Sequence, residues 1–142
     1  MKLSRTEIEA LWKKWDLAWN RHDLDSVMEF FHDEIYFENW TGGHARGKEK
    51  LREGWKRWFE NHGNFQFIQE EMFFDEDNQK LLYHWLLKWP SFEKGYEGKP
   101  EERSGVDIIH FEGGKIITKL TYSKTSITIE GKRVILTATG RT

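Results

Sequence analysis

Apolar residues recur at steps of three and four through the first 62 residues, the spacing that places side chains on one face of a helix. The first stripe predicts a helix over 5–20 and consists of Ile8, Leu11, Trp12, Trp15, Ala18 and Trp19. Asp23 stands at the N-cap position of a second, short helix. A third helix is predicted from about Lys48 to His62, with the stripe Leu51, Trp55, Trp58, Phe59 and His62.

Strand patterns dominate the rest of the chain. Four segments are rich in β-branched and aromatic residues and are separated by turn-forming sequences: 64–74, 80–89, 102–111 and 115–127. A strand is also predicted at 34–40, ahead of a loop at 41–47, and 129–136 is a candidate for a last hairpin strand. Helices followed by antiparallel strands favour an α+β fold with the helices on one face of the sheet. We expect one domain over 1–142, because no repeat or linker interrupts the pattern.

Composition excludes several classes of protein. The net charge is -2 and both signs are interspersed, so no basic stripe indicates nucleic acid. The chain has no cysteine, which excludes thiol chemistry and is compatible with a reducing cytosol. No apolar run approaches the roughly 20 residues of a membrane span, and the N-terminal stretch has no signal-peptide core. We therefore expect a cytoplasmic protein with neither nucleic acid nor membrane as a partner.

Asp107 lies inside the apolar run GVDIIHF, where an aspartate is disfavoured. Strand alternation places it on one face with Gly105, Ile109 and Phe111, so its neighbours are apolar. Loss of solvation there would raise the pKa of its carboxyl and make it a candidate proton donor or general acid/base. The alternative is a structural ion pair with Lys119 or Arg103. A contact with Arg103 along the strand would span roughly 13 Å at about 3.3 Å per residue.

Four stretches together resemble the nuclear transport factor 2-like superfamily, and within it the SnoaL-like polyketide cyclases and ketosteroid isomerases. They are AWNRHDLDSVMEFF, DEIYFENWTGG, RGKEKLREGW and GVDIIHFEGGKI, and the resemblance extends to about Ser126. It implies a curved antiparallel sheet wrapped around the long N-terminal helix into a cone, open to a small apolar molecule. It also implies a homodimer through the outer sheet face, and an acid at Asp107 that faces the interior.

The sequence departs from the steroid isomerases at two of their catalytic positions. The position of their base is Asn39, and that of their phenol is Trp15. An amide has no useful basicity and an indole is only a hydrogen-bond donor, so steroid isomerisation is not expected. Asn39 could instead orient a substrate carbonyl or a water. Glu38 would replace the base only if the strand slipped by one residue, which turns every side chain to the other face.

Further candidates are a possible proton relay, His84, and a hydroxyl, Tyr122, each with a structural alternative. The mixed face of its strand favours an outward or interface position for His84, and Tyr122 could equally be a cross-strand packing residue. The expected apolar wall of the cavity consists of Trp15, Trp19, Phe37, Trp55, Trp85, Trp89 and Ile109. Helical aromatic stripes usually pack a core, so that alternative stays open for the tryptophans. The histidines beside aspartates lack metal-ligand spacing, and no metal site is predicted.

The sequence thus predicts a small-molecule-binding domain that carries out acid/base chemistry without a cofactor. The reaction would be an isomerisation, a cyclisation, a hydration or a dehydration. Two alternatives of the same fold remain, a non-catalytic ligand-binding module and a protein-interaction domain, because fold alone does not choose among them.

Overall fold

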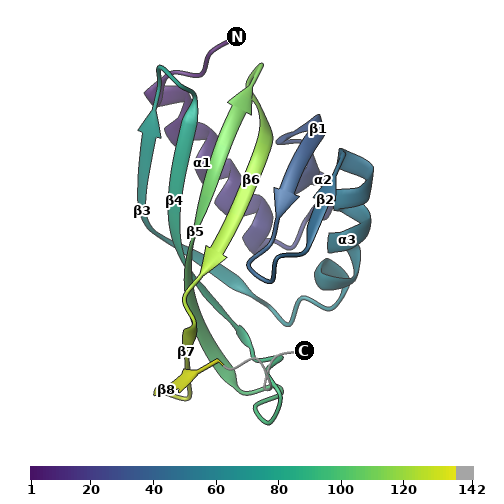
Figure 1. Ribbon diagram of the computed structural model, residues 1–142, viewed down its shortest axis with the longest axis vertical. Helices are drawn as coiled ribbons and strands as arrows, with labels where there is room; N and C mark the ends of the chain where they lie inside the picture. Colours follow the sequence, from purple (N-terminus) through teal and green to yellow (C-terminus); the bar gives the residue numbers. More distant parts are fainter. Residues whose placement is uncertain (137–142) are drawn as a thin grey trace.

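The computed structural model describes residues 1–136 and places the three helices where the apolar stripes predict them (Figure 1). Residues 137–142 of the expected 1–142 domain lie outside the described residues. Helix α1 (Arg5–Asn20) begins at a capping box, in which Ser4 and Glu7 satisfy each other's backbone amides. Helix α2 (Leu24–Met28) is capped by Asp23, as expected, and α3 (Lys48–Glu60) follows Gly47, whose φ of 93° suits glycine.

One sheet holds all the strands of the described residues. They are β1 (Phe31–Glu38), β2 (His44–Arg46), β3 (Gln66–Asp75), β4 (Lys80–Pro90), β5 (Pro100–Glu112), β6 (Lys115–Ser123), β7 (Ser126–Ile129) and β8 (Lys132–Ile135). The order is β2-β1-β6-β5-β4-β3, with β7 paired to β5 and β8 paired to β7. The sheet curls strongly, and the helices cover its concave face (Figure 1). The fold is therefore α+β, with a half-barrel built around the helices.

Three details differ from the sequence-based prediction. The expected loop 41–47 contains strand β2, and the expected strand 115–127 is divided into β6 and β7. Strands β1 and β6 are parallel, so the sheet is mixed rather than wholly antiparallel. A parallel pair is possible here because the long connection through α3 and four strands removes the constraint of a hairpin.

Strand β5 has the alternating burial expected for a strand with one face toward the interior. Its buried positions are Glu101, Arg103, Gly105, Asp107, Ile109 and Phe111, and the intervening residues are exposed or half-buried. Asp107 is therefore on the inner face, as predicted, although one face of the strand is not fully covered. Ile109 is fully buried in the packed core rather than in the cavity wall, which corrects its predicted role.

Gly105 sets the position of one large side chain on the inner face. It pairs with Trp85 across β4 and β5, and a Cβ atom at this glycine would lie 2.5 Å from the Trp85 ring. The same atom would lie 2.3 Å from the backbone oxygen of Tyr122. The missing side chain therefore allows the indole to lie directly over β5, next to Asp107.

Candidate functional site

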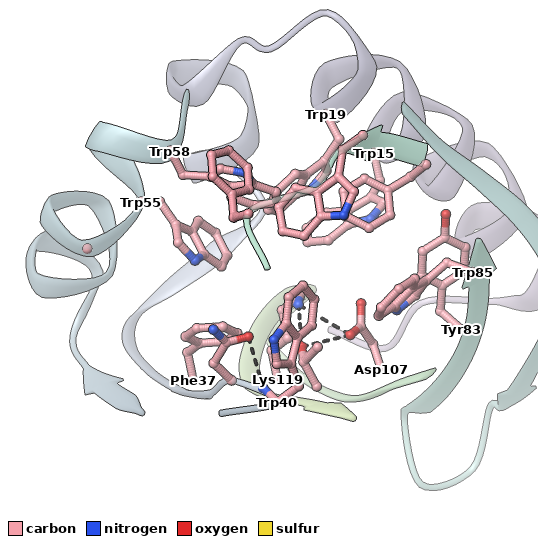
Figure 2. Close-up of a pocket in the computed structure, with 16 residues that line it drawn as sticks. Trp15, Trp19, Phe37, Trp40, Trp55, Trp58, Tyr83, Trp85, Asp107 and Lys119 are labelled. Atoms are coloured by element: carbon pink, nitrogen blue, oxygen red, sulfur yellow. Dashed lines mark hydrogen bonds and ion pairs between the residues drawn. The ribbon is translucent and has the colours of Figure 1, made fainter. Parts of the chain in front are cut away.

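A cavity of about 350 Å³ lies between the helices and the inner face of the sheet (Figure 2). Its lining is mostly aromatic and comprises Trp15, Trp19, Phe37, Asn39, Trp40, Gly54, Trp55, Trp58, Phe67, Tyr83, Trp85, Trp89, Phe92, Asp107, Lys119 and Thr121. Seven of the eight tryptophans of the chain are in this set, and Trp12 packs in the core instead. The unusual tryptophan content is thus explained mainly by the cavity.

Most of the residues predicted for the site do lie together. Figure 2 shows the indoles of α1 and α3 on one side of the cavity, with Phe37, Lys119 and Asp107 facing them from the sheet. The predicted residues in the lining are Trp15, Trp19, Phe37, Asn39, Trp55, Trp85, Trp89 and Asp107. The helical positions among them, Trp15, Trp19 and Trp55, line the cavity and also belong to the hydrophobic core.

Tyr122 and His84 lie outside the cavity, which corrects their inclusion among the site residues, and for His84 the outward position is the one its strand pattern favoured. Tyr122 is 49% exposed on the outer face. His84 is also on that face, 3.4 Å from Glu71 and 3.3 Å from the Ser104 hydroxyl. The error for Tyr122 has a structural cause. The pairing of β5 with β6 shifts between Thr118 and Ile116, so Ile117 is an extra residue and the alternation of faces changes there.

Because of this shift, Ile116 faces inward, and so do Lys119 and Thr121. We call Asp107, Lys119 and Thr121 the Lys119 triad. The Thr121 hydroxyl donates to Asp107 Oδ1 at 2.7 Å, and Lys119 Nζ donates to Thr121 Oγ1 at 2.8 Å. The Lys119 ammonium is 3.4 Å from the same Asp107 oxygen. The ion pair that the sequence left as an alternative therefore exists, but it lies inside the cavity.

Geometry explains why these three side chains meet. Asp107 and Thr121 are direct partners across β5 and β6, and Lys119 is two residues along the same face. The side chains of Lys119 and Asp107 are only 6% and 5% exposed. Within residues 1–136, Asp107 Oδ2 has no hydrogen-bond partner, and Figure 2 shows it pointing toward the opposite wall. One carboxylate oxygen is thus held by the protein and the other is left to the cavity.

Burial dominates the electrostatics of Lys119. Desolvation lowers the pKa of its ammonium from the ordinary value of 10.5, and the nearby Asp107 carboxylate opposes that shift only in part. The nitrogen also lies 5.0 Å from the ring centre of Phe37 and 5.8 Å from that of Trp55. These aromatic faces attract a cation but replace water poorly.

A second titratable pair lies beside the triad. Tyr83 lines the cavity as the direct strand partner of Asp107, and its hydroxyl donates to Asp16 Oδ1 at 2.5 Å. Burial raises the pKa of the Asp16 carboxyl, and burial together with Asp16 raises the pKa of the Tyr83 phenol. On strand alternation Tyr83 shares a face with Trp85 and Trp89, which the sequence predicted for the cavity wall, so the sequence contained a signal for this residue. The tyrosine hydroxyl is engaged by α1 rather than left free for a ligand.

The partly exposed end of the lining, which we call the mouth, includes Asn39, Trp40 and Phe92, of which the sequence predicted only Asn39. Asn39 Oδ1 accepts from the Trp40 backbone amide at 2.9 Å. Glu38 takes the opposite face, where it accepts from the Tyr36 hydroxyl at 2.9 Å. The strand therefore has the expected register, and Glu38 does not replace the missing base.

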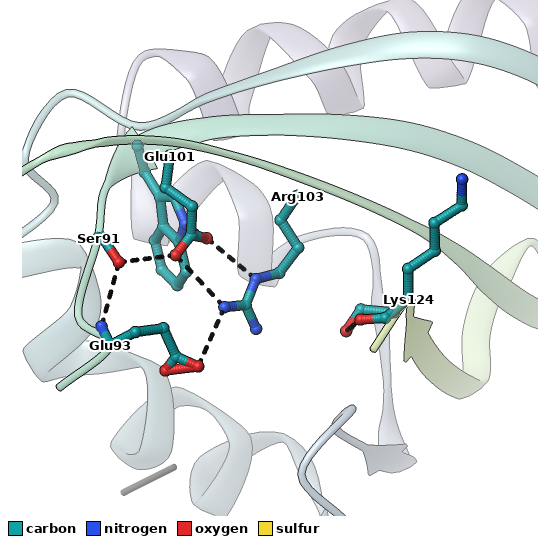
Figure 3. Close-up of polar contacts among 7 residues, drawn as sticks. Ser91, Glu93, Glu101, Arg103 and Lys124 are labelled. Carbon is teal, nitrogen blue, oxygen red and sulfur yellow. Dashed lines mark hydrogen bonds and ion pairs between the residues drawn. The ribbon is translucent and has the colours of Figure 1, made fainter. Parts of the chain in front are cut away.

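A second buried charged group borders the mouth, and we call it the Arg103 cluster (Figure 3). Arg103 Nε donates to Glu101 Oε2 at 3.0 Å, and its Nη2 lies 3.5 Å from Glu93. Glu101 also accepts from the Ser91 hydroxyl at 2.9 Å and from the Trp89 indole N–H. The guanidinium stacks on Trp40 at 5.0 Å from the ring centre. This cluster fixes two aromatic side chains of the cavity wall.

Two further results concern classes of site. In the part of the chain that the structure describes, no three histidine, aspartate or glutamate side chains come together in a way that could hold a metal ion. Among the helices of residues 1–136, none is long and apolar enough to cross a membrane.

Comparison with known proteins identifies the family. A family model for the SnoaL-like domain matches residues 12–119, so the chain belongs to the SnoaL-like domain family. This family falls within the nuclear transport factor 2-like superfamily, as the sequence resemblance indicated. A search of curated proteins found no match.

Several solved structures share the fold. A SnoaL-like protein of unknown function from Burkholderia thailandensis is 17% identical, with a TM-score of 0.68, over 87% of this chain and 99% of that one. A candidate polyketide cyclase from Xanthomonas campestris is 14% identical, with a TM-score of 0.67, over 82% and 89% of the two chains. A candidate ketosteroid isomerase from Kribbella flavida is 14% identical, with a TM-score of 0.63, over 81% and 76%. At these identities the likeness establishes the fold alone.

Proposed function

We propose that this protein is a cytoplasmic, cofactor-independent enzyme that transfers a proton within a small, largely aromatic molecule bound in the cavity. The observation that carries the proposal is the Asp107 carboxylate, which is buried among indoles with Oδ2 free and Oδ1 held by Thr121. A volume of about 350 Å³ is at the small end of ligand pockets, so the substrate has a few rings at most. An isomerisation needs only this step, and in a cyclisation the enolate that it forms would attack a second carbonyl carbon of the same molecule, whose oxygen then takes the proton from Asp107.

The arrangement of oxygens suggests how Asp107 would act. Because Oδ1 accepts the Thr121 hydrogen bond, a proton carried by this carboxyl would reside on Oδ2, the oxygen that faces the cavity. Asp107 would then remove a proton from a carbon next to a carbonyl and return it at another position. Asn39 at the mouth would orient the carbonyl, and the tryptophans would hold the apolar body.

Hydrogen–deuterium exchange tests this proposal without knowledge of the natural substrate. Small aryl ketones, with 2-acetylnaphthalene as the first probe, are incubated with the protein in D₂O and followed by proton NMR. We expect catalysed exchange next to the carbonyl, and a loss of about 100-fold or more in Asp107→Asn. Affinity, measured by tryptophan fluorescence, should stay within about tenfold. The exposed Asp33→Asn is the matched control.

A ligand-binding role without catalysis is the second candidate, and Asn39 favours it, since the position of the family's base is an amide. In that case the ligand quenches tryptophan fluorescence but no exchange occurs in the wild type. If no apolar ligand alters the fluorescence at all, the cavity is not a ligand site and an interaction domain becomes the better description.

A homodimer through the outer sheet face is part of the same proposal. This face presents Ile68, Phe73 and Tyr122, which are 42%, 60% and 49% exposed, with half-buried leucines and Val106 between them. Apolar surface of this kind is typical of an interface. Light scattering should give twice the 17.1 kDa chain mass for the wild type and a lower mass for Tyr122→Asp.

A further inference from the structure

Lys119 is enclosed in the cavity floor without a structural requirement that explains it. Its side chain is 6% exposed, and it lies in the middle of β6. Thr121 gives Asp107 a hydrogen bond, and Lys119 adds the counter-charge. Burying an ion pair brings little net stability, because the loss of solvation offsets the attraction. Replacing both members of such a pair by apolar residues is often neutral, so the fold does not require the pair as a whole.

The position of the amine suits attack on a ligand. In the described part of the chain, Nζ has two polar neighbours, the Thr121 hydroxyl at 2.8 Å and Asp107 Oδ1 at 3.4 Å. Figure 2 shows the nitrogen on the cavity side of these groups, opposite the indoles of α1 and α3. Burial lowers the pKa of Lys119, so the neutral amine, which is the nucleophilic form, is more accessible than on a surface lysine.

We propose that Lys119 forms an imine with the carbonyl group of an aromatic aldehyde or ketone bound in the cavity. The inference rests on the proposed function only in requiring that the cavity accept such a ligand. It adds covalent catalysis to the proton transfer assigned to Asp107.

The step balances within the Lys119 triad. Lys119 passes one ammonium proton to Asp107, and the nitrogen lone pair attacks the carbonyl carbon to form a C–N bond. The carbonyl oxygen takes a proton from the nitrogen to give a carbinolamine. Asp107 then returns its proton to that hydroxyl, the C–O bond breaks, and water leaves as the C=N bond forms. The net change converts an ammonium and a carbonyl into an iminium and water, with no oxidant or reductant.

The residues around Lys119 suit the iminium product as well as the starting ammonium. The iminium nitrogen keeps the positive charge beside the Asp107 carboxylate, so the buried pair stays balanced. The ring faces of Phe37 and Trp55 that now lie 5.0 and 5.8 Å from the ammonium would also face the iminium. An aromatic body on the carbonyl compound would extend toward the tryptophans.

Reductive trapping tests the inference directly. The protein is incubated with 2-naphthaldehyde and sodium cyanoborohydride near neutral pH, and the modified lysine is identified by peptide mass spectrometry. We expect Lys119 to be modified about tenfold faster or more than any other lysine. Lys119→Arg, which keeps the charge, and Lys119→Met should both lose this fast phase. Lys88→Met, at a half-exposed lysine of the outer face, should retain it.

The alcohol 2-naphthalenemethanol, which lacks the carbonyl, separates the two proposals. If it quenches tryptophan fluorescence and Lys119 is still not modified preferentially, the imine is wrong and the binding proposal stands. If neither compound binds, the proposed ligand site itself is wrong. Modification of Lys119 at the rate of surface lysines would also overturn the imine. This outcome is read from the wild-type protein, so it does not depend on whether any variant folds.

Discussion

Two groups of buried charges lie on the inner face of the same sheet, and they are built differently. In the Arg103 cluster, the Glu101 carboxylate accepts from a guanidinium, a hydroxyl and an indole, and both of its oxygens are engaged. In the Lys119 triad, Asp107 is engaged through one oxygen only. The first group borders the mouth and the second forms the floor.

The difference separates a structural network from a candidate reactive one. Buried polar groups are normally satisfied, and a fully bonded network makes one arrangement rigid and specific. A buried carboxylate with one oxygen not hydrogen-bonded by the protein, beside a desolvated amine in a cavity wall, is instead typical of functional sites. Burial alone therefore does not mark the site, since Glu101 is as buried as Asp107. What distinguishes Asp107 from Glu101 is that, within residues 1–136, one of its carboxylate oxygens has no hydrogen-bond partner.

Removing the guanidinium should have the largest effect on stability. Arg103→Met leaves Glu101 buried without its counter-ion, and we expect the free energy of unfolding to fall by about 3–5 kcal/mol in urea titrations. The exposed Arg133→Met should change it by less than about 0.5 kcal/mol. Adding Glu101→Gln to Arg103→Met should restore part of the loss. Equal effects of the two arginine variants would show that the cluster is not structural.

Removing the carboxylate from the triad should cost less, because a lysine can lose its proton and an arginine cannot. For Asp107→Leu we expect a loss of about 1–3 kcal/mol at pH 7. Buried Lys119 has a lowered pKa, so the unfolded chain binds more protons between that pKa and 10.5. Its contribution to stability therefore rises with pH across this window. The rise should begin at lower pH in Asp107→Leu, since the carboxylate that opposed the shift is absent.

Urea titrations from pH 7 to 10 measure this dependence, and Lys119→Met provides the reference because it has no amine to titrate. The unfolding free energy of Asp107→Leu minus that of the reference should increase with pH. A flat difference would mean that Lys119 is solvated in the folded protein, against its burial in the structure.

Gly105→Ala should disturb the wall between the two groups. Its Cβ would meet the Tyr122 backbone oxygen at 2.3 Å and the Trp85 ring at 2.5 Å, so Trp85 must move toward the cavity. We expect a loss of about 1–3 kcal/mol and weaker binding of 2-naphthalenemethanol. Gly43→Ala, outside the cavity lining, is the matched control, since its added Cβ would meet only the Thr41 hydroxyl oxygen, at an ordinary contact distance of 3.5 Å. Similar losses in both would indicate that the Trp85 contact is unimportant.

Much of this architecture could be predicted from the sequence, because periodicity records which side of an element is buried. The stripes on α1 and α3 gave the helices, and the apolar neighbours of Asp107 placed it on the inner face. The aromatic alternation in β4 gave Trp85 and Trp89 as cavity residues. These assignments depend on local spacing within one element.

The rest of the site depends on information that local spacing lacks. In β6, strict alternation places Ile116, Leu120 and Tyr122 on one face, and the sequence left open which face points inward. The extra residue Ile117 breaks that alternation, and an outer face with apolar residues resembles an inner one. Lys119 and Thr121 could therefore not be placed on the inner face from the sequence. Trp40 and Phe92 reach the mouth through chain reversals that no periodic pattern describes.

The smallest effect is expected at Glu93, the outermost member of the Arg103 cluster. Its side chain is 14% exposed and lies 3.5 Å from Arg103, whereas Glu101 is 0% exposed and lies 3.0 Å away. Because Glu101 already balances the guanidinium, Glu93 adds a second negative charge whose attraction is offset by repulsion between the carboxylates. We expect Glu93→Gln to change the free energy of unfolding by less than about 1 kcal/mol.

The exposed Glu102→Gln, at an ion pair of 3.9 Å with Lys88, should behave in the same way, and both small effects should shrink in 1 M salt. A loss at Glu93 comparable to that of Arg103→Met would show that both carboxylates are needed to hold the guanidinium. Glu93 and Glu101 would then contribute equally to the free energy of unfolding, although Glu93 is the less buried of the two.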